Sequence, residues 1–153
     1  MGHINVLFFD AKQGDLDYFR TEQEQYVHQR GADSWRNILT ARSLREIQDL
    51  DLQKNAPNIG FFDAFTDGQY NAEAVAAARW IHQYTPRFAL APHLPALYLL
   101  VQDAGNIPAE VNQAKHDRTV RGILPKLNTP AKIVQTINEL IMDVEFPHQF
   151  LHP

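Results

Sequence analysis

The sequence contains no cysteine, and this single absence removes several kinds of site. Without thiols the chain can hold no disulfide framework, no thiolate zinc site and no cysteine nucleophile. A chain free of cysteine suits a reducing compartment, and we therefore expect a cytoplasmic protein.

Long apolar runs and clusters of basic residues are also missing. The longest uninterrupted apolar runs include Val6–Phe9, Ala74–Ala78 and Leu97–Val101, whereas a membrane-spanning helix needs about 20 apolar residues. We therefore expect neither a membrane span nor a signal peptide. The 14 Lys and Arg residues form no run and are outnumbered by 18 Asp and Glu residues, which gives a net charge of −4. This balance argues against binding to nucleic acid, which needs clustered cations.

What is present is ordinary globular composition, with 44% apolar and 21% charged residues in a chain of 153. This length is typical of one domain, and no internal repeat or low-complexity stretch divides it. We assign residues 1–144 to a single domain. Residues 145–153 contain two prolines and are interpreted as a C-terminal tail or the start of a linker.

Short apolar runs rich in branched or aromatic residues predict five buried strands. These are Ile4–Phe9, Trp35–Ala41, Ile59–Phe62, Leu97–Val101 and Gly122–Leu124. Segments with helical spacing lie between and after them, at Gly14–Tyr26, from Ser43, at Ala72–Tyr84, at Ile107–Asp117 and from Pro130 to Val144. Such alternation is typical of a parallel sheet covered by helices on both faces. We predict an α/β fold, a three-layer (βα)₅ flavodoxin-like sandwich with strand order 2-1-3-4-5.

Polar residues follow four of these strands. Asp10 follows the first, Asp63 the third, Gln102 the fourth, and Lys126 comes just after the fifth. Ligands of open parallel sheets bind beyond the carboxyl ends of the strands, where these side chains would meet. The plainer interpretation is that polar residues end strands wherever the chain reaches water. Three charged strand ends together favour a site made of Asp10, Asp63 and Lys126.

Several of these segments resemble the receiver domain of bacterial two-component response regulators. INVLFFD is similar to the first strand of that family with its terminal acid, and NIGFFD to the third strand with its phosphoacceptor aspartate. ILTARSLREI and PALYLLV resemble the second and fourth strands. GILPKLNTPAKIVQTINEL resembles the fifth strand, its lysine and the final helix.

The resemblance implies roles for these residues. Asp63 would be the phosphoacceptor, Asp10 and Asp63 the acidic pocket that holds Mg²⁺, and Lys126 the lysine of the family. Such a module is not an enzyme, and no catalytic residue is expected. Its partners would be a histidine kinase and an output domain or protein.

The resemblance also implies a weak homodimer through the fourth helix, fifth strand and fifth helix. On this chain that face would include Val111, Lys115, Arg118, Arg121 and exposed positions of the last helix such as Lys132 and Gln135.

Two departures from the family pattern bear on the chemistry. Ala11 stands where the family has a second acid, so the metal loses one ligand unless Asp15 or Gln13 reaches in. Leu100 stands at the switch position, where the family has a hydroxyl that bonds the new phosphoryl group. We expect Ala11 and Leu100 to present apolar surface in the site, and Mg²⁺ binding to be weak or absent. The sequence is therefore interpreted as a degenerate, or pseudo-, receiver in which phosphorylation is impaired or absent.

Two alternatives stay open. A working phospho-acceptor would use Asp63 with a reduced metal shell. A flavodoxin-like small-ligand-binding protein or enzyme would use the same strand-end edge, and a deep apolar pocket there would favour it.

Overall fold

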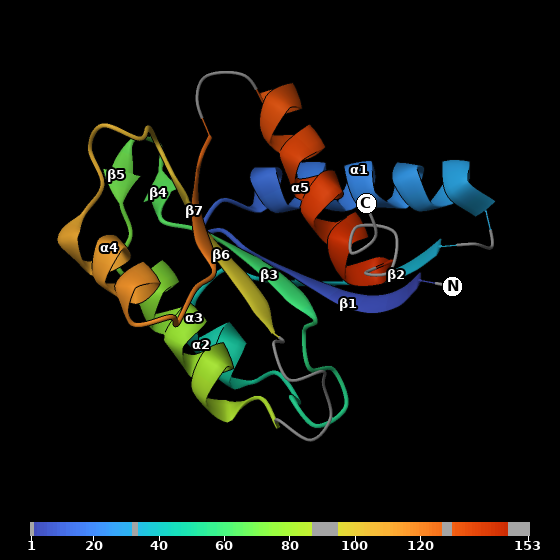
Figure 1. Cartoon of the computed structure of the whole chain (residues 1–153), viewed down its shortest axis with the longest axis horizontal. Coiled ribbons are helices and arrows are strands. Elements are labelled where there is room, and N and C mark those ends of the chain that lie inside the picture. Colours follow the sequence, from blue (N-terminus) through green and yellow to red (C-terminus); the bar gives the residue numbers. More distant parts are fainter. Residues whose placement is uncertain (1, 32–33, 87–94, 127–129, 147–153) are drawn as a thin grey trace, which may run out of the picture.

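A five-stranded parallel sheet forms the centre of the computed structural model, which describes residues 2–31, 34–86, 95–126 and 130–146. Its strands are β1 (Gly2–Phe9), β2 (Ser34–Ala41), β3 (Ile59–Asp63), β6 (Ala96–Val101) and β7 (Gly122–Pro125). Their spatial order is β2-β1-β3-β6-β7, and every neighbouring pair is parallel. The predicted fold class and strand order are confirmed (Figure 1).

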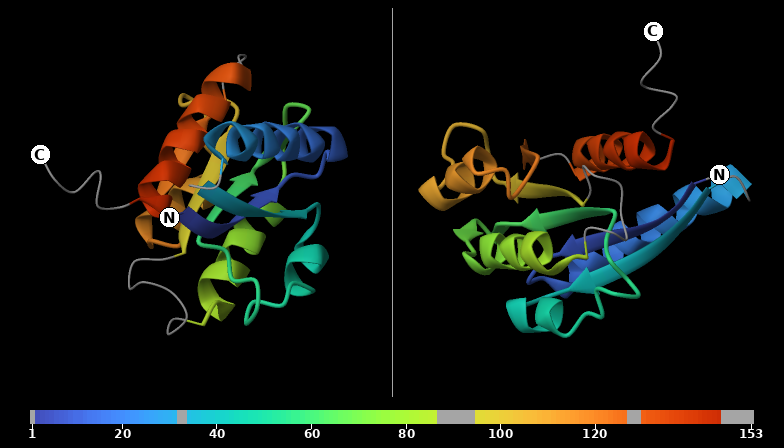
Figure 2. Two further views of the ribbon diagram at one scale, coloured as in Figure 1. Left: turned by 90° about the vertical axis from the view of Figure 1, so that its right-hand side faces the viewer. Right: turned by 60° about the horizontal axis from the view of Figure 1, so that its bottom comes forward.

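Helices cover both faces of the sheet (Figure 2). One face carries α1 (Gln13–Arg30) and α5 (Pro130–Glu145), and the other carries α2 (Leu44–Gln48), α3 (Glu73–Tyr84) and α4 (Ala109–His116). The two faces explain the unbroken apolar strands, since alternate side chains of each strand enter different cores. Phe8, Phe61 and Tyr98 line the core beneath α1 and α5, whereas Phe62 and Leu99 face the other three helices.

A small hairpin interrupts the predicted alternation of strands and helices. Strands β4 (Phe65–Thr66) and β5 (Gln69–Tyr70) pair antiparallel directly after β3. Asp67 and Gly68 make the turn with φ of 51° and 80°, as in the two-residue turns whose twist matches a hairpin. The Asp-Gly pair is the sequence signal for this element, and the strands were too short for their apolar pattern to reveal it.

Two helices end later than their sequence pattern predicts. Helix α1 continues past Tyr26 to Arg30 and stops at Gly31, whose φ of 68° suits glycine. Helix α5 ends at Glu145, one residue past Val144, where its sequence pattern ends. The physical reason is an ion pair of 2.8 Å between Glu145 and Arg36 of β2, in which neither side chain is exposed. Residues 147–153 of the predicted tail lie outside the described residues.

No helix among the described residues is long and apolar enough to cross a membrane.

Candidate functional site

The carboxyl ends of three strands bring Asp10, Asp63 and Lys126 together. Asp10 follows β1 and Asp63 ends the adjacent strand β3, and the two residues are only 1% and 2% exposed. Lys126 follows β7, where its backbone N–H donates to the Val101 carbonyl at 2.8 Å. The geometry that the strand-end pattern predicts for these three residues is present.

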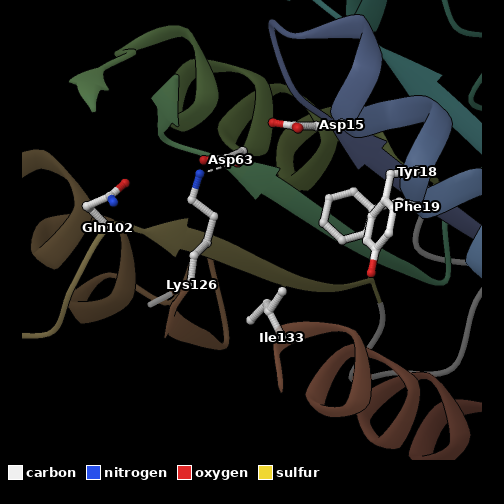
Figure 3. Close-up of a pocket in the computed structure, with 7 residues that line it drawn as sticks. All are labelled: Asp15, Tyr18, Phe19, Asp63, Gln102, Lys126 and Ile133. Carbon is white, nitrogen blue, oxygen red and sulfur yellow. Dashed lines mark hydrogen bonds and ion pairs between the residues drawn. The ribbon is translucent and has the colours of Figure 1, made fainter. Parts of the chain in front are cut away.

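Asp63 has a hydrogen-bond partner for each carboxylate oxygen. Its Oδ1 accepts the backbone N–H of Phe65 at 2.9 Å, and its Oδ2 accepts Lys126 Nζ at 2.8 Å (Figure 3). The same ammonium donates to the Phe65 carbonyl at 3.1 Å. Lys126 therefore ties the acid at the end of β3 to the start of the β4–β5 hairpin.

A third carboxylate, from Asp15, joins the two strand-end acids. Carboxylate oxygens of Asp10, Asp15 and Asp63 all lie within 4.8 Å of one another. The Lys12 N–H donates to Asp10 Oδ1 at 2.9 Å, and α1 begins one residue later. The first turn of α1 thus delivers Asp15 to the strand ends. Asp15, one of the two residues that the sequence offered in place of the acid missing at Ala11, therefore lies beside Asp10 and Asp63.

Burial and like charge dominate the electrostatics of this cluster. Burial, together with the charge of Asp63, raises the pKa of Asp10 to about 8. Burial also raises the pKa of Asp63, and the ion pair with Lys126 opposes that rise. Asp10 Oδ2 is buried, and no N–H or hydroxyl of the described residues donates to it. Its carboxyl can hydrogen-bond Asp63 or Asp15 only when it carries a proton. A proton or a cation between these carboxylates would relieve their mutual repulsion.

Leu100, the residue that the resemblance places at the switch position, is part of the core rather than of the site surface. It lies in register with Asp63 and Leu124, is 1% exposed, and packs in the cluster beneath α5. The expectation that Leu100 presents apolar surface to the site is therefore wrong, because the isobutyl group fits the gap between sheet and helix. Ala11 is half-buried, and its carbonyl accepts Arg42 Nη2 at 3.2 Å.

A cavity of about 400 Å³ opens beside the ion pair (Figure 3). Its polar lining comes from Asp15, Asp63, Gln102 and Lys126, and its apolar lining from Tyr18, Phe19 and Ile133. Gln102 comes directly after Val101, the last residue of β6. The sequence predicts only that Gln102 follows a strand. Its position in the site depends on the shape of the cavity, which cannot be predicted from the sequence pattern.

Comparison with known proteins identifies this architecture. No protein-family model matches the sequence, and no curated protein matches it. A CheY-like response regulator receiver domain protein from Methanospirillum hungatei JF-1 does match in structure, with a TM-score of 0.62 and 15% identity. The match covers 93% of this chain and 96% of that one. The chain has the receiver fold.

Other solved structures share the receiver fold at similarly low identity. The Mn(2+)-bound form of the response regulator Rcp1 is 11% identical, with a TM-score of 0.62 over 94% of this chain and 96% of that chain. An adenylate cyclase from Rhodopirellula baltica is 15% identical, with a TM-score of 0.61 over 96% and 93%. At these identities the likeness is one of fold. Within the receiver fold, Asp10, Asp63 and Lys126 occupy the carboxyl edge of the sheet.

Proposed function

We propose that this chain is a receiver-like signal-transduction module that acts through contacts with other proteins and in which phosphoryl acceptance at Asp63 is impaired. The observation that carries the proposal is the pairing of Asp63 with Lys126 at the carboxyl edge of a receiver fold. We further infer a regulatory rather than an enzymatic role in the cytoplasm, with a histidine kinase or an output protein as partner.

The residues present fit a divalent cation such as Mg²⁺. Asp10, Asp15 and Asp63 would supply carboxylate oxygens. The Phe65 carbonyl, which accepts Lys126 Nζ at 3.1 Å, lies beside the Asp63–Lys126 ion pair. Such hard oxygen donors are those that Mg²⁺ prefers, and the buried Asp10 Oδ2 has no other donor among the described residues. A bound divalent cation would screen the negative charge of an incoming phosphoryl group. A metal site here would therefore be more complete than Ala11 alone suggests, because Asp15 would contribute a third carboxylate.

The impairment concerns the carboxylate oxygens of Asp63, which are already engaged, and the response to a phosphoryl group. Asp63 is 2% exposed, and both of its oxygens are already engaged by Phe65 and Lys126. Leu100 has no hydroxyl with which to bond a phosphoryl oxygen, and it is packed in the core. A phosphoryl group on Asp63 would therefore form no new bond with Leu100 that could shift β6. A phosphoryl group on Asp63 would thus form slowly and shift the sheet little.

The second candidate is a working phospho-acceptor, and the position of Asp15 favours it, since a three-carboxylate cluster restores the charge that Ala11 removes. Incubation with Mg²⁺ and acetyl phosphate, followed by intact-mass measurement, separates the two candidates. We expect no stable gain of a phosphoryl group under conditions that modify an intact receiver measured in parallel. A gain in the wild type that Asp63→Asn abolishes would refute the impaired function and establish the second candidate.

A further inference from the structure

The cavity beside the Asp63–Lys126 pair has the composition of a site for a small organic ligand. Its volume of about 400 Å³ lies within the range of ligand pockets. Figure 3 shows the rings of Tyr18 and Phe19 on one side of it and Lys126 on the other, with Asp15 at the end that leads to the acid cluster. One end is thus charged and one wall is aromatic.

The aromatic wall is rigid and only partly covered. The Phe19 ring stacks on Phe8 with centroids 5.1 Å apart and planes 1° apart, so its position is set by the core. The rings of Tyr18 and Phe19 pack edge to face, with centroids 5.7 Å apart. The Tyr18 side chain is nevertheless among the few large apolar groups on the described surface, with 40% exposure. A flat ring placed against Tyr18 would bury this surface without moving the core.

The charged end favours a cation. Asp63 is already neutralised by Lys126, whereas Asp15 adds a carboxylate to the same lining. A carboxylate or phosphate entering alone would meet net negative charge in a partly desolvated site, where like charges repel strongly. An ammonium would instead pair with Asp15.

We propose that this cavity binds a small aromatic primary amine, with its ammonium on Asp15 and its ring against Tyr18. Resting on the proposed receiver-like function, such a ligand supplies the input that phosphorylation of Asp63 no longer provides. The ligand and a divalent cation compete for Asp15, so the two would be alternative occupants of the site.

Calorimetric titration of phenethylamine into the whole chain, with a chelator present, tests this proposal. We expect saturable binding of one phenethylamine molecule per chain. Its binding should be at least about tenfold tighter than that of 3-phenylpropionate, a probe of similar shape and opposite charge. A tenfold ratio corresponds to one charge interaction of about 1.4 kcal/mol. Asp15→Asn and Tyr18→Ala should each weaken binding about tenfold, and added Mg²⁺ should raise the apparent Kd.

Matched controls separate the pocket from general effects on the protein. Asp17→Asn alters a neighbouring exposed acid of α1, and Tyr84→Ala removes a tyrosine of α3 that is 50% exposed. Both should leave binding unchanged, and circular dichroism checks that every variant folds. Absence of phenethylamine binding, equal binding of 3-phenylpropionate, or insensitivity to Asp15→Asn and Tyr18→Ala would each overturn the proposal. Acetyl phosphate labelling reads the proposed function separately, so failure of one leaves the other intact.

Discussion

At the scale of single residues, the ion pair between Asp63 and Lys126 is where charge and burial compete most directly. Lys126→Met should destabilise the fold by about 1–3 kcal/mol, because it leaves the buried carboxylate of Asp63 without its cation. Asp63→Asn should be neutral or stabilising, since the amide still accepts the Phe65 N–H while the cost of burying the Asp63 charge is removed. Urea unfolding at pH 7 in a chelator measures both.

Lys54→Met serves as the control for the loss of a lysine, because Lys54 is exposed and should change stability by less than about 0.5 kcal/mol. Strong destabilisation by Asp63→Asn would show that the Asp63 charge stabilises the fold, against this account of the site.

The raised pKa of Asp10 predicts a stability that falls as pH rises. The folded pKa of about 8 lies above the ordinary value of 3.8. Between these values the folded chain therefore binds a proton that the unfolded chain has lost. Stability should decrease from pH 4 to pH 8 with a slope of at most about 1.4 kcal/mol per pH unit, and level off above pH 8.

Asp10→Asn should flatten this profile and raise stability at pH 7, because an amide needs no proton to hydrogen-bond Asp63. Denaturant unfolding at successive pH values, with Asp17→Asn as the control on an exposed acid, measures the difference. A wild-type profile that is flat from pH 5 to pH 8 would contradict the shifted pKa.

At the scale of elements, a buried polar contact holds α5 against β2. Arg36 donates to Glu145 through Nη2 at 2.8 Å and Nε at 3.0 Å, and its guanidinium lies 4.0 Å from the centre of the Tyr26 ring. Glu145→Gln would leave a buried guanidinium without its charge partner, which costs about 3–5 kcal/mol. Glu139→Gln on the exposed face of α5 should cost less than about 0.5 kcal/mol. Thermal unfolding of the two variants would show equal losses if the buried pair did not matter.

The β4–β5 hairpin and the start of α1 offer a matched pair of glycines. Gly68 has φ of 80°, so Gly68→Ala should destabilise the fold by about 1 kcal/mol through backbone strain, although no atom would touch the new Cβ. Gly14 is helical with equally open surroundings, and Gly14→Ala should stabilise by about 0.5–1 kcal/mol. Denaturation midpoints that move in the same direction for both variants would contradict this account.

The elements also show which parts of the structure a sequence can predict. Five strands and their order follow from apolar runs, because burial on both faces leaves a strong signal. Glu145 could not be assigned to the last helix from its pattern, since its partner Arg36 is far away in the sequence and Glu145 adds no apolar residue to the helical stripe. Asp10, Asp63 and Lys126 follow from strand ends. Asp15 does not, because its place in the cluster depends on the residue at which α1 begins.

At the scale of the whole molecule, the face predicted to form a weak homodimer needs one correction. Val111 is fully buried in the core beneath α4 and cannot contribute to an interface. Lys115, Arg118 and Arg121 are exposed next to β7, as predicted for this face. Glu110 and Asp117 are exposed on the same segment, so the face carries both signs of charge with a small basic excess. A second copy that covered Lys115, Arg118 and Arg121 would have to supply acids.

Exposed acids of α5 can supply that complement in a two-fold symmetric dimer. Glu139 and Asp143 are exposed on α5, so one copy could place them against Lys115 and Arg118 of the other. Charge pairs at an exposed rim bind weakly and are screened by salt, so we expect a small interface below about 1,200 Å². Light scattering at rising protein concentration should show a dimer that weakens between low and high salt. Lys115→Glu should abolish the dimer, while Lys54→Glu, an exposed lysine between α2 and β3, should leave it unchanged. A monomer at every concentration and salt level would refute the predicted homodimer, and this face could then bind only other proteins.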